Sequence, residues 1–286
     1  MPATSLASRP AWWQWPTVLS LDAPAVTMAW QIALASSVGF SLHPAHVWVL
    51  ATSVWLAYVA DRWAEGWRLT SERVRTQRHR FYHRHRWPVA LVWSLVLIAD
   101  VAVSITTLPR ADLVRGLVLT SAVLLYLLVE LPLVRRRRWD LPKEACTALL
   151  LTAGVGLFLA TSTRATELVW PLALFALLCF TNCALISAWE RDVDLAHGQS
   201  SMALRSHRSA GAIRLLPFVG GAAWIVFGLL THPSLRPVAI AGAASAAGLA
   251  AIDRLEPRLG WPPARVLADA VLLSPVAALI WQRWSA

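Results

Sequence analysis

The stretch SAWERDVDLAHG, at residues 187–198, follows the run LVWPLALFALLCFTNCALI at 168–186, which contains no charged side chain. A run of about 20 apolar residues is long enough to cross a bilayer as a helix. Directly after it, Glu190, Asp192 and Asp194 bring three carboxylates close together. Because like charges repel, this acidic stretch either lies in water and marks the end of the span or holds something positive.

The composition extends the membrane interpretation to the whole chain. Of the 286 residues, 57% are hydrophobic and 15% are charged. Soluble domains have about 45–50% apolar and about 25% charged residues, so an ordinary soluble protein is excluded. The net charge is +10, carried by arginines in the loops between apolar runs, which favours the positive-inside signal of a membrane protein over nucleic-acid binding. The three cysteines lie within apolar runs and indicate no disulfide framework.

The hydrophobic pattern predicts an all-α, polytopic membrane protein with about nine transmembrane helices in a single domain over 1–286. Residues 1–22 do not have the order of a signal peptide and are expected to form an interfacial segment. The predicted spans are 24–42, 45–63, 87–107, 112–134, 144–163, 168–189, 212–230, 236–253 and 263–282.

The loops alternate between basic and nearly neutral. Eight arginines lie in 62–86, and basic residues also gather in 135–143, in 190–214 and just before the last span, while the loops between these have one each. Since basic loops face the cytoplasm, the N-terminus is expected inside and the C-terminus outside, in a cytoplasmic membrane. The second and sixth spans then end on the same, cytoplasmic side.

Those two spans end with matching acidic pairs. Asp61 and Glu65 are four residues apart, as are Glu190 and Asp194, so each pair shares one face of a helix. Facing carboxylate pairs favour a divalent cation such as Mg²⁺, which binds oxygen ligands and is commonly shared with substrate phosphates. Two solvated helix ends would explain the same pattern without a site. The basic residues that would bind phosphate oxygens are Arg62, Arg68, Arg138 and Lys143.

These motifs resemble those of the UbiA superfamily of membrane-embedded prenyltransferases, which have nine helices and two aspartate-rich motifs, after helices 2 and 6. The stretch ERDVDLAHGQSSMAL at 190–204 resembles the second motif, and Lys143 lies where the family often has a basic residue. The chain departs from the first motif, because Ala57 and Tyr58 occupy its leading Asn/Asp positions. Glu65 and Glu190 each stand where the family has Asp.

The resemblance implies a Mg²⁺-dependent transferase that moves a prenyl group from an isoprenyl diphosphate to an aromatic or lipid-like acceptor. Its catalytic metal ligands would be Asp61, Glu65, Glu190 and Asp194. The basic residues above would bind the diphosphate, and Tyr58 and Asn182 would line the cavity. Alternatives are a UbiA-type cyclase of prenyl diphosphates and a non-catalytic or transport protein that retains the fold; nucleic acid is not an expected partner.

Other polar residues allow further hypotheses. His79, His83 and His85 resemble part of the histidine boxes of membrane iron enzymes, but His43, His46 and His232 fall on the other side of the membrane. A basic, aromatic segment on anionic lipid, or a cap over the site, explains 75–87 better. Asp100 and Asp269 lie within predicted spans and are expected to face the bundle interior.

Overall fold

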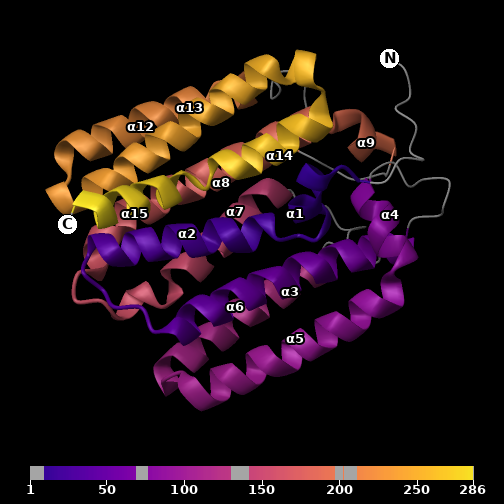
Figure 1. The fold of residues 1–286 in the computed structure, drawn as a ribbon, viewed down its shortest axis with the longest axis horizontal. Coiled ribbons are helices and arrows are strands. Elements are labelled where there is room, and N and C mark those ends of the chain that lie inside the picture. The colour runs from indigo at the N-terminus through magenta and orange to yellow at the C-terminus, as the bar shows by residue number, and fades with distance from the viewer. Residues whose placement is uncertain (1–9, 69–76, 130–141, 197–201, 203–210, 286) are drawn as a thin grey trace.

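The computed structural model describes residues 10–68, 77–129, 142–196, 202 and 211–285, which form helices and turns and no β-strand (Figure 1). In lipid a helix satisfies its own backbone hydrogen bonds, which is why apolar runs of this length become helices. The predicted all-α class is confirmed. The α-helices are α1 (Trp15–Val18), α2 (Asp22–Ser37), α3 (Pro44–Arg68), α4 (Gln77–Arg84), α5 (Arg86–Thr107), α6 (Arg110–Val129), α7 (Lys143–Leu157), α8 (Val169–Trp189), α9 (Arg191–Ala196), α12 (Leu216–Leu230), α13 (Arg236–Leu259), α14 (Trp261–Val271) and α15 (Ser274–Ser285).

Each predicted span falls on helix, but fewer of these helices are long and apolar enough to cross a membrane. Within the described residues six meet that test, and a seventh is reached if the pair Trp12–Val18 and Asp22–Ser37, bent by 78°, counts as one span. Helix α7 has 15 residues, about 22 Å of helix, which is short for a bilayer core. The structure is therefore that of a polytopic helical protein, and the number nine stays a prediction.

The last predicted span, 263–282, differs from the single straight helix that its hydrophobicity suggests. It consists of α14 and α15, joined at Leu272 and Leu273. A helix break frees carbonyl groups that need new donors. Two interior side chains supply them: Ser245 Oγ donates to the Val271 carbonyl at 2.8 Å, and Trp30 Nε1 donates to the Leu272 carbonyl at 2.9 Å. Hydrogen bonds from α13 and α2 therefore stabilise this helix break.

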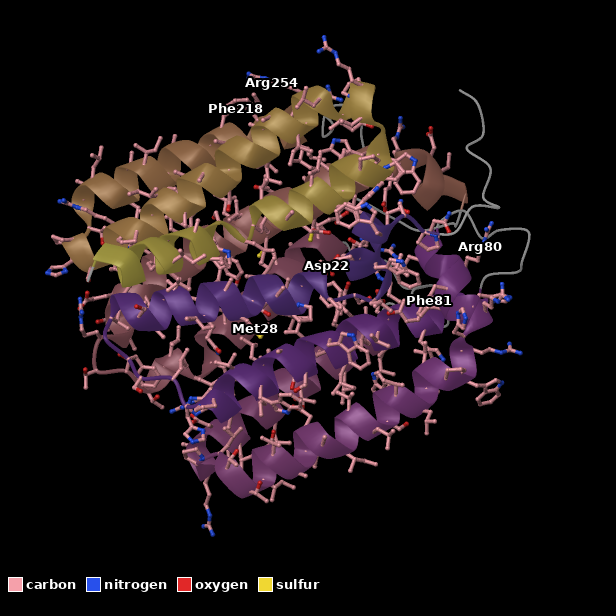
Figure 2. The ribbon with its side chains drawn as sticks, in the orientation of Figure 1. Asp22, Met28, Arg80, Phe81, Phe218 and Arg254 are labelled. Atoms are coloured by element: carbon pink, nitrogen blue, oxygen red, sulfur yellow. The ribbon has the colours of Figure 1, made fainter. Side chains whose placement is uncertain are left out.

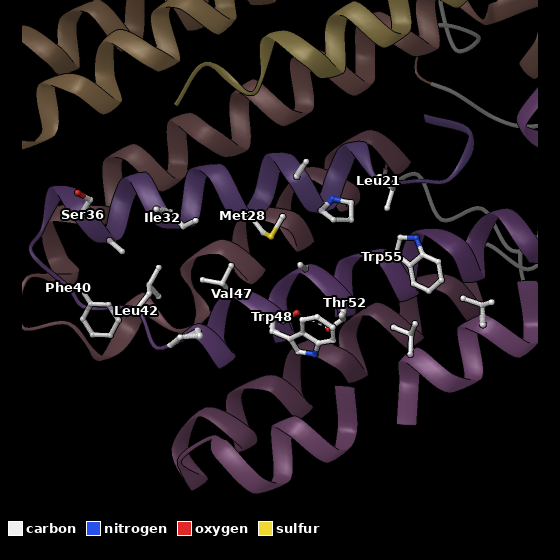
Figure 3. A pocket seen from close by; sticks show the side chains of 17 residues that line it. Leu21, Met28, Ile32, Ser36, Phe40, Leu42, Val47, Trp48, Thr52 and Trp55 are labelled. Atoms are coloured by element: carbon white, nitrogen blue, oxygen red, sulfur yellow. Dashed lines mark hydrogen bonds between the residues drawn. The ribbon is translucent and has the colours of Figure 1, made fainter. Parts of the chain in front are cut away.

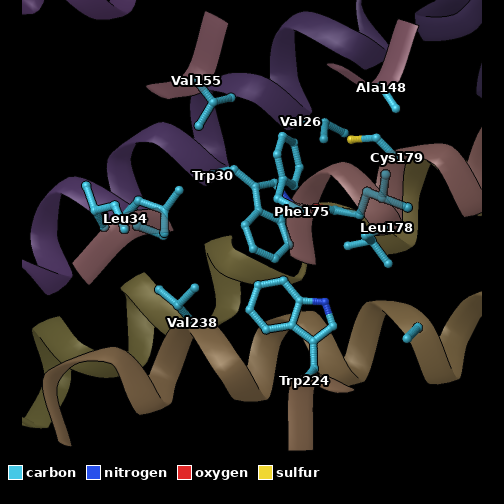
Figure 4. Packing of buried hydrophobic residues seen from close by; sticks show 14 of the residues in the cluster. Val26, Trp30, Leu34, Ala148, Val155, Phe175, Leu178, Cys179, Trp224 and Val238 are labelled. Atoms are coloured by element: carbon cyan, nitrogen blue, oxygen red, sulfur yellow. Dashed lines mark hydrogen bonds between the residues drawn. The ribbon is translucent and has the colours of Figure 1, made fainter. Parts of the chain in front are cut away.

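The core lies where α2, α8 and α12 meet around Trp30 (Figure 4). The Trp30 ring lies 4.8 Å from Phe175 and 5.5 Å from Trp224, centroid to centroid. Gly242 on α13 faces the Trp224 ring so closely that an added Cβ would clash with it. Small residues at such positions let helix backbones approach each other where no water is present to drive packing.

Helices α5 and α6 form the periphery, and almost none of either is buried. The polar exception on α5 is Asp100, which is buried and accepts hydrogen bonds from the hydroxyls of Thr52 and Ser53 on α3, the latter at 2.9 Å. The prediction that Asp100 faces the bundle interior is confirmed. In lipid, such side-chain bonds fix which face of a helix meets its neighbour.

The two ends of the bundle are unlike. The C-terminal ends of α3 and α8 lie at one end, together with α4, α9 and the start of α14 (Figure 1). We call this the charged end. The other end contains the turn between α5 and α6 and the start of α8. We call it the opposite end.

Candidate functional site

The C-terminal ends of α3 and α8 both lie at the charged end (Figure 1). Tyr58 on α3 lies close enough to Cys183 on α8 for an electrostatic interaction between them. One turn further along α3, Arg62 is near enough to Glu190 to stabilise its carboxylate. Residues far apart in the chain therefore share one interior region.

The strongest contact in this region joins Glu190 to Arg265 on α14. Arg265 Nη1 donates to both carboxylate oxygens, at 2.6 and 2.8 Å, and Glu190 is only 7% exposed. Burial opposes ionisation of Glu190. The charge of Arg265 and then that of Arg78, with the Arg265 hydrogen bonds, outweigh it, so the pKa of Glu190 lies below its ordinary value. Glu190 is thus a buried carboxylate held ionised by arginine.

A second polar group lies deeper, between α2, α8 and α14. Asn182 Nδ2 donates to Asp269 Oδ1 at 2.9 Å, and the Asp22 carboxyl at the start of α2 lies near enough to Asp269 to interact with it electrostatically. Asp269 follows Arg265 by one turn on the same face of α14. The predicted inward orientation of Asp269 is confirmed. We call the whole set the charged cluster: Asp22, Asp61, Arg62, Arg78, Asn182, Glu190, Arg265 and Asp269.

Helix α4 packs over the charged end through its aromatic residues. Tyr82 is buried, and its hydroxyl lies 3.1 Å from the Ser20 hydroxyl. Burial raises the pKa of Tyr82, which therefore stays neutral. Phe81 makes an edge contact with Trp15 at 6.0 Å, and Figure 2 shows Phe81 and Asp22 at the same end of the bundle. Together with the burial of Arg78, these contacts favour a cap over the cluster rather than a helix free on the lipid surface.

Two of the four predicted metal ligands, Asp61 and Glu190, have side chains that the structure describes. Asp61 has 37% of its side chain exposed and pairs with Arg62 at 3.5 Å, whereas both oxygens of Glu190 accept from Arg265. The side chains of Glu65 and Asp194 lie outside the described residues. Within the part of the chain that is described, no group of three or more His, Cys, Asp or Glu residues is arranged to hold a metal ion. The set of metal ligands therefore stays a prediction, and Glu190 could join it only if Arg265 released its oxygens.

Two of the four predicted phosphate-binding residues, Arg62 and Lys143, likewise have side chains that the structure describes. Arg62 belongs to the charged cluster, and Lys143 at the start of α7 lies close enough to Cys183 to interact with it electrostatically. The Arg68 side chain and Arg138 lie outside the described residues. The helices α2, α7 and α14 begin at this end with partly positive N-termini, whereas α3 and α8 end there with partly negative C-termini.

An apolar groove of about 1140 Å³ runs beside the cluster, between α2, α3 and α5 (Figure 3). Leu21 and Trp55 line it at the charged end, and Phe40 and Leu42 line it at the opposite end. Leu21 directly precedes Asp22, so the groove begins next to a cluster carboxyl. Its volume exceeds the roughly 300–1,000 Å³ of pockets for small ligands, and its length follows the membrane-embedded helices.

Comparison of this chain with known proteins finds no relative. No protein-family model matches the chain, and neither a curated protein nor a solved structure shows significant similarity to it. The assignment of function therefore rests on the residues and the geometry.

Three cluster members were not singled out from the sequence: Arg265, Arg78 and Asp22. In the sequence, Arg265 belongs to the basic stretch around the start of the last span and resembles the other loop arginines. The available signal was Asp269, four residues later, since an acid and a base one turn apart in an apolar segment indicate an interior polar face. No comparable signal marks Asp22.

Proposed function

We propose that this protein transfers a prenyl group from an isoprenyl diphosphate to an aromatic or lipid-like acceptor, with Mg²⁺, at the cytoplasmic face of the membrane. The observation that carries the proposal is the presence of two unlike surfaces at one end of the bundle. One is a cluster with the buried Arg78 and the nearly buried Arg265, and the other is an apolar groove lined at that end by Leu21, the residue before Asp22. An allylic diphosphate has the matching form, with a polyanionic head on an apolar chain.

The charged end supplies binding for the head. Arg62 and Lys143 would donate to diphosphate oxygens, because cationic donors make the strongest hydrogen bonds to phosphate. The N-termini of α2 and α7 add favourable dipoles at the same end. Magnesium, when bound by Asp61 with Glu65 and Asp194, would neutralise charge on the diphosphate. Arg265 would hold Glu190 ionised and in place.

The groove supplies binding for the chain and keeps water out. When the allylic C–O bond breaks, the diphosphate leaves with the electron pair, and positive charge spreads over the allylic carbons. The ring of Trp55, which lines the groove at the charged end, and that of Tyr58, one turn further along α3, are suited to stabilise that charge by cation–π attraction. The acceptor then forms the new bond to carbon and loses a proton.

A cyclase and a transport protein are the other candidates. Cyclisation needs the same charged end and differs only in the absence of an external acceptor. A transporter is favoured by one observation, the break between α14 and α15, because discontinuous helices often bind ions in transporters. The carbonyls freed at the break are, however, already paired with Ser245 and Trp30, so they are not available to a substrate.

The test is the fate of labelled prenyl diphosphates of several chain lengths in membranes that contain the protein, with and without Mg²⁺. We expect metal-dependent consumption, lost by about 100-fold or more in Asp61→Asn, as when one charge-stabilising group is removed from an active site. Arg164→Ala, at the opposite end, should keep full turnover. Consumption without an acceptor product indicates cyclisation. Turnover that Asp61→Asn leaves unchanged would overturn the proposal.

A further inference from the structure

The apolar groove is closed at the opposite end by the connection between α2 and α3. These two helices form two of its walls, and the turn at 38–43 joins them. Phe40 and Leu42, both in this turn, line the groove and pack against the hydrophobic core (Figure 3). A groove between two helices cannot continue past the turn that joins them. The groove therefore has a defined length.

Helix α2 measures that length. Leu21 lines the groove at the charged end, and Ser36, which is 15 residues later, lines it near the turn. A helix rises 1.5 Å per residue, so the groove is about 22 Å long. An extended isoprene unit adds four chain bonds of about 1.5 Å, which is about 5 Å of length once bond angles are included. The groove therefore has room for about four or five isoprene units.

The polar side chains on the wall of the groove are bonded within the protein. The Thr52 hydroxyl donates to the Trp48 carbonyl at 2.8 Å and meets the Asp100 carboxyl. Trp55 Nε1 donates to the Leu19 carbonyl at 3.0 Å. Most of the other lining side chains are apolar, including those of Met28, Ile32, Val47 and Val96. Since a polar group on the occupant would lose its hydrogen bonds without replacement, the wall fits a plain hydrocarbon chain.

We propose that the groove selects prenyl chains of about four or five isoprene units, with the far end of the chain against Phe40. This inference rests on the proposed function, which places the diphosphate at the charged end. A shorter chain leaves part of the wall without contact, and a longer chain must leave the groove before the turn. Because the chain comes from lipid and not from water, each added unit contributes packing contacts, with a gain in affinity of about twofold to fivefold.

The experiment is equilibrium binding of labelled prenyl alcohols, from two to ten isoprene units long, to the purified protein in detergent. We expect the affinity to rise with each unit up to four or five and then to level off or fall. Ala51→Phe, on the groove wall one turn from Trp55, should move the optimum to about two units. Phe40→Ala should lengthen it by about one unit. Ala122→Phe, on the exposed face of α6, should leave it unchanged.

Two results would overturn the proposal: an affinity that does not depend on chain length, which indicates bilayer lipid in the groove, or an optimum that neither groove variant moves. Phe40→Ala, which removes bulk from a turn, serves as the test if Ala51→Phe does not fold. Alcohols carry no diphosphate, so their binding is measured apart from the reaction. Turnover of diphosphates without a length optimum contradicts this inference alone, whereas a length optimum for alcohols without any turnover contradicts the proposed function alone.

Discussion

The two ends of the bundle carry charge in different ways. At the opposite end, Arg164 pairs with Glu167, three residues away and exposed. The buried Asp112 there pairs with Arg115, three residues away, and its Oδ2 lies 3.7 Å from Nε2 of His46 on α3, a histidine that is charged only when protonated. At the charged end, Glu190 pairs with Arg265, 75 residues away and on a different helix. Local pairs form wherever a helix end meets water. A pair between distant helices requires both charges to be carried into the interior.

This difference between exposed local pairs and the interior pair indicates which charged residues are candidates for function. Pairs exposed to solvent contribute little to stability. Burying an ion pair costs desolvation free energy, which only good geometry offsets. Replacing such a pair with apolar residues of similar volume often leaves the stability of a protein unchanged or raises it. The charged end retains arginines in the interior where packing does not need them, which fits a site for an anionic ligand.

The largest expected effect comes from removing one partner of the interior pair. Arg265→Ala leaves the buried Glu190 carboxylate without its cation and should lower the free energy of unfolding by about 3–5 kcal/mol. Arg164→Ala should have no measurable effect, because its pair with Glu167 is exposed. Denaturant unfolding of both variants in the same detergent measures the two changes in unfolding free energy. Similar losses in Arg265→Ala and Arg164→Ala would contradict the distinction between the two ends.

Replacing both partners separates structure from function. Glu190→Leu combined with Arg265→Met should recover most of the stability that Arg265→Ala loses, to within about 1–2 kcal/mol of the wild type. The double variant should nevertheless lose turnover of prenyl diphosphate, since Glu190 is a predicted catalytic residue. A stable double variant with full turnover would show that the interior pair serves the fold alone.

Acid should weaken the charged end through Glu190. Since its folded pKa lies below the ordinary value, its ion pair stabilises the protein at neutral pH. That stabilisation should persist down to about pH 4.3, the ordinary pKa of a glutamate, and fall as the pH drops further through the folded pKa. Unfolding midpoints measured down to pH 3 should show a shallower decline in Glu190→Gln. Parallel wild-type and variant curves would contradict the assignment.

The smallest expected effect concerns the cap formed by α4. Tyr82→Phe removes the hydroxyl that meets Ser20 and should cost about 1 kcal/mol. At the opposite end Ser234→Ala removes a comparable but exposed contact with His232 and should cost nothing measurable. Equal effects in thermal unfolding would indicate that α4 is not packed against Ser20 in the membrane.

The sequence predicts the periodic and the charged features well. The apolar runs predict the helix positions, and the alternation of basic and nearly neutral loops predicts that the second and sixth spans, which correspond to α3 and α8, end on the same side. Asp100 was expected to face inward because a lipid-facing carboxylate is too costly. These features follow from local chemistry, which is why the sequence alone reveals them.

The features that arise from packing could not be predicted in this way. The break at Leu272 depends on Ser245 and Trp30, which lie on other helices. The groove depends on how α2, α3 and α5 lie relative to one another, and hydrophobicity does not record the distance between helices. Arg265 looks like a loop arginine until the fold places it opposite Glu190.

Binding of a prenyl diphosphate tests the central claim, that the charged end and the groove together form one site. Equilibrium binding should be measured for a labelled prenyl diphosphate and for the alcohol of the same chain length, with wild type and Lys143→Ala. We predict that the wild type binds the diphosphate far more tightly, and that Lys143→Ala weakens diphosphate binding by about tenfold but not alcohol binding, as expected for the loss of one charge-assisted hydrogen bond. Equal affinity for diphosphate and alcohol in the wild type would contradict the account.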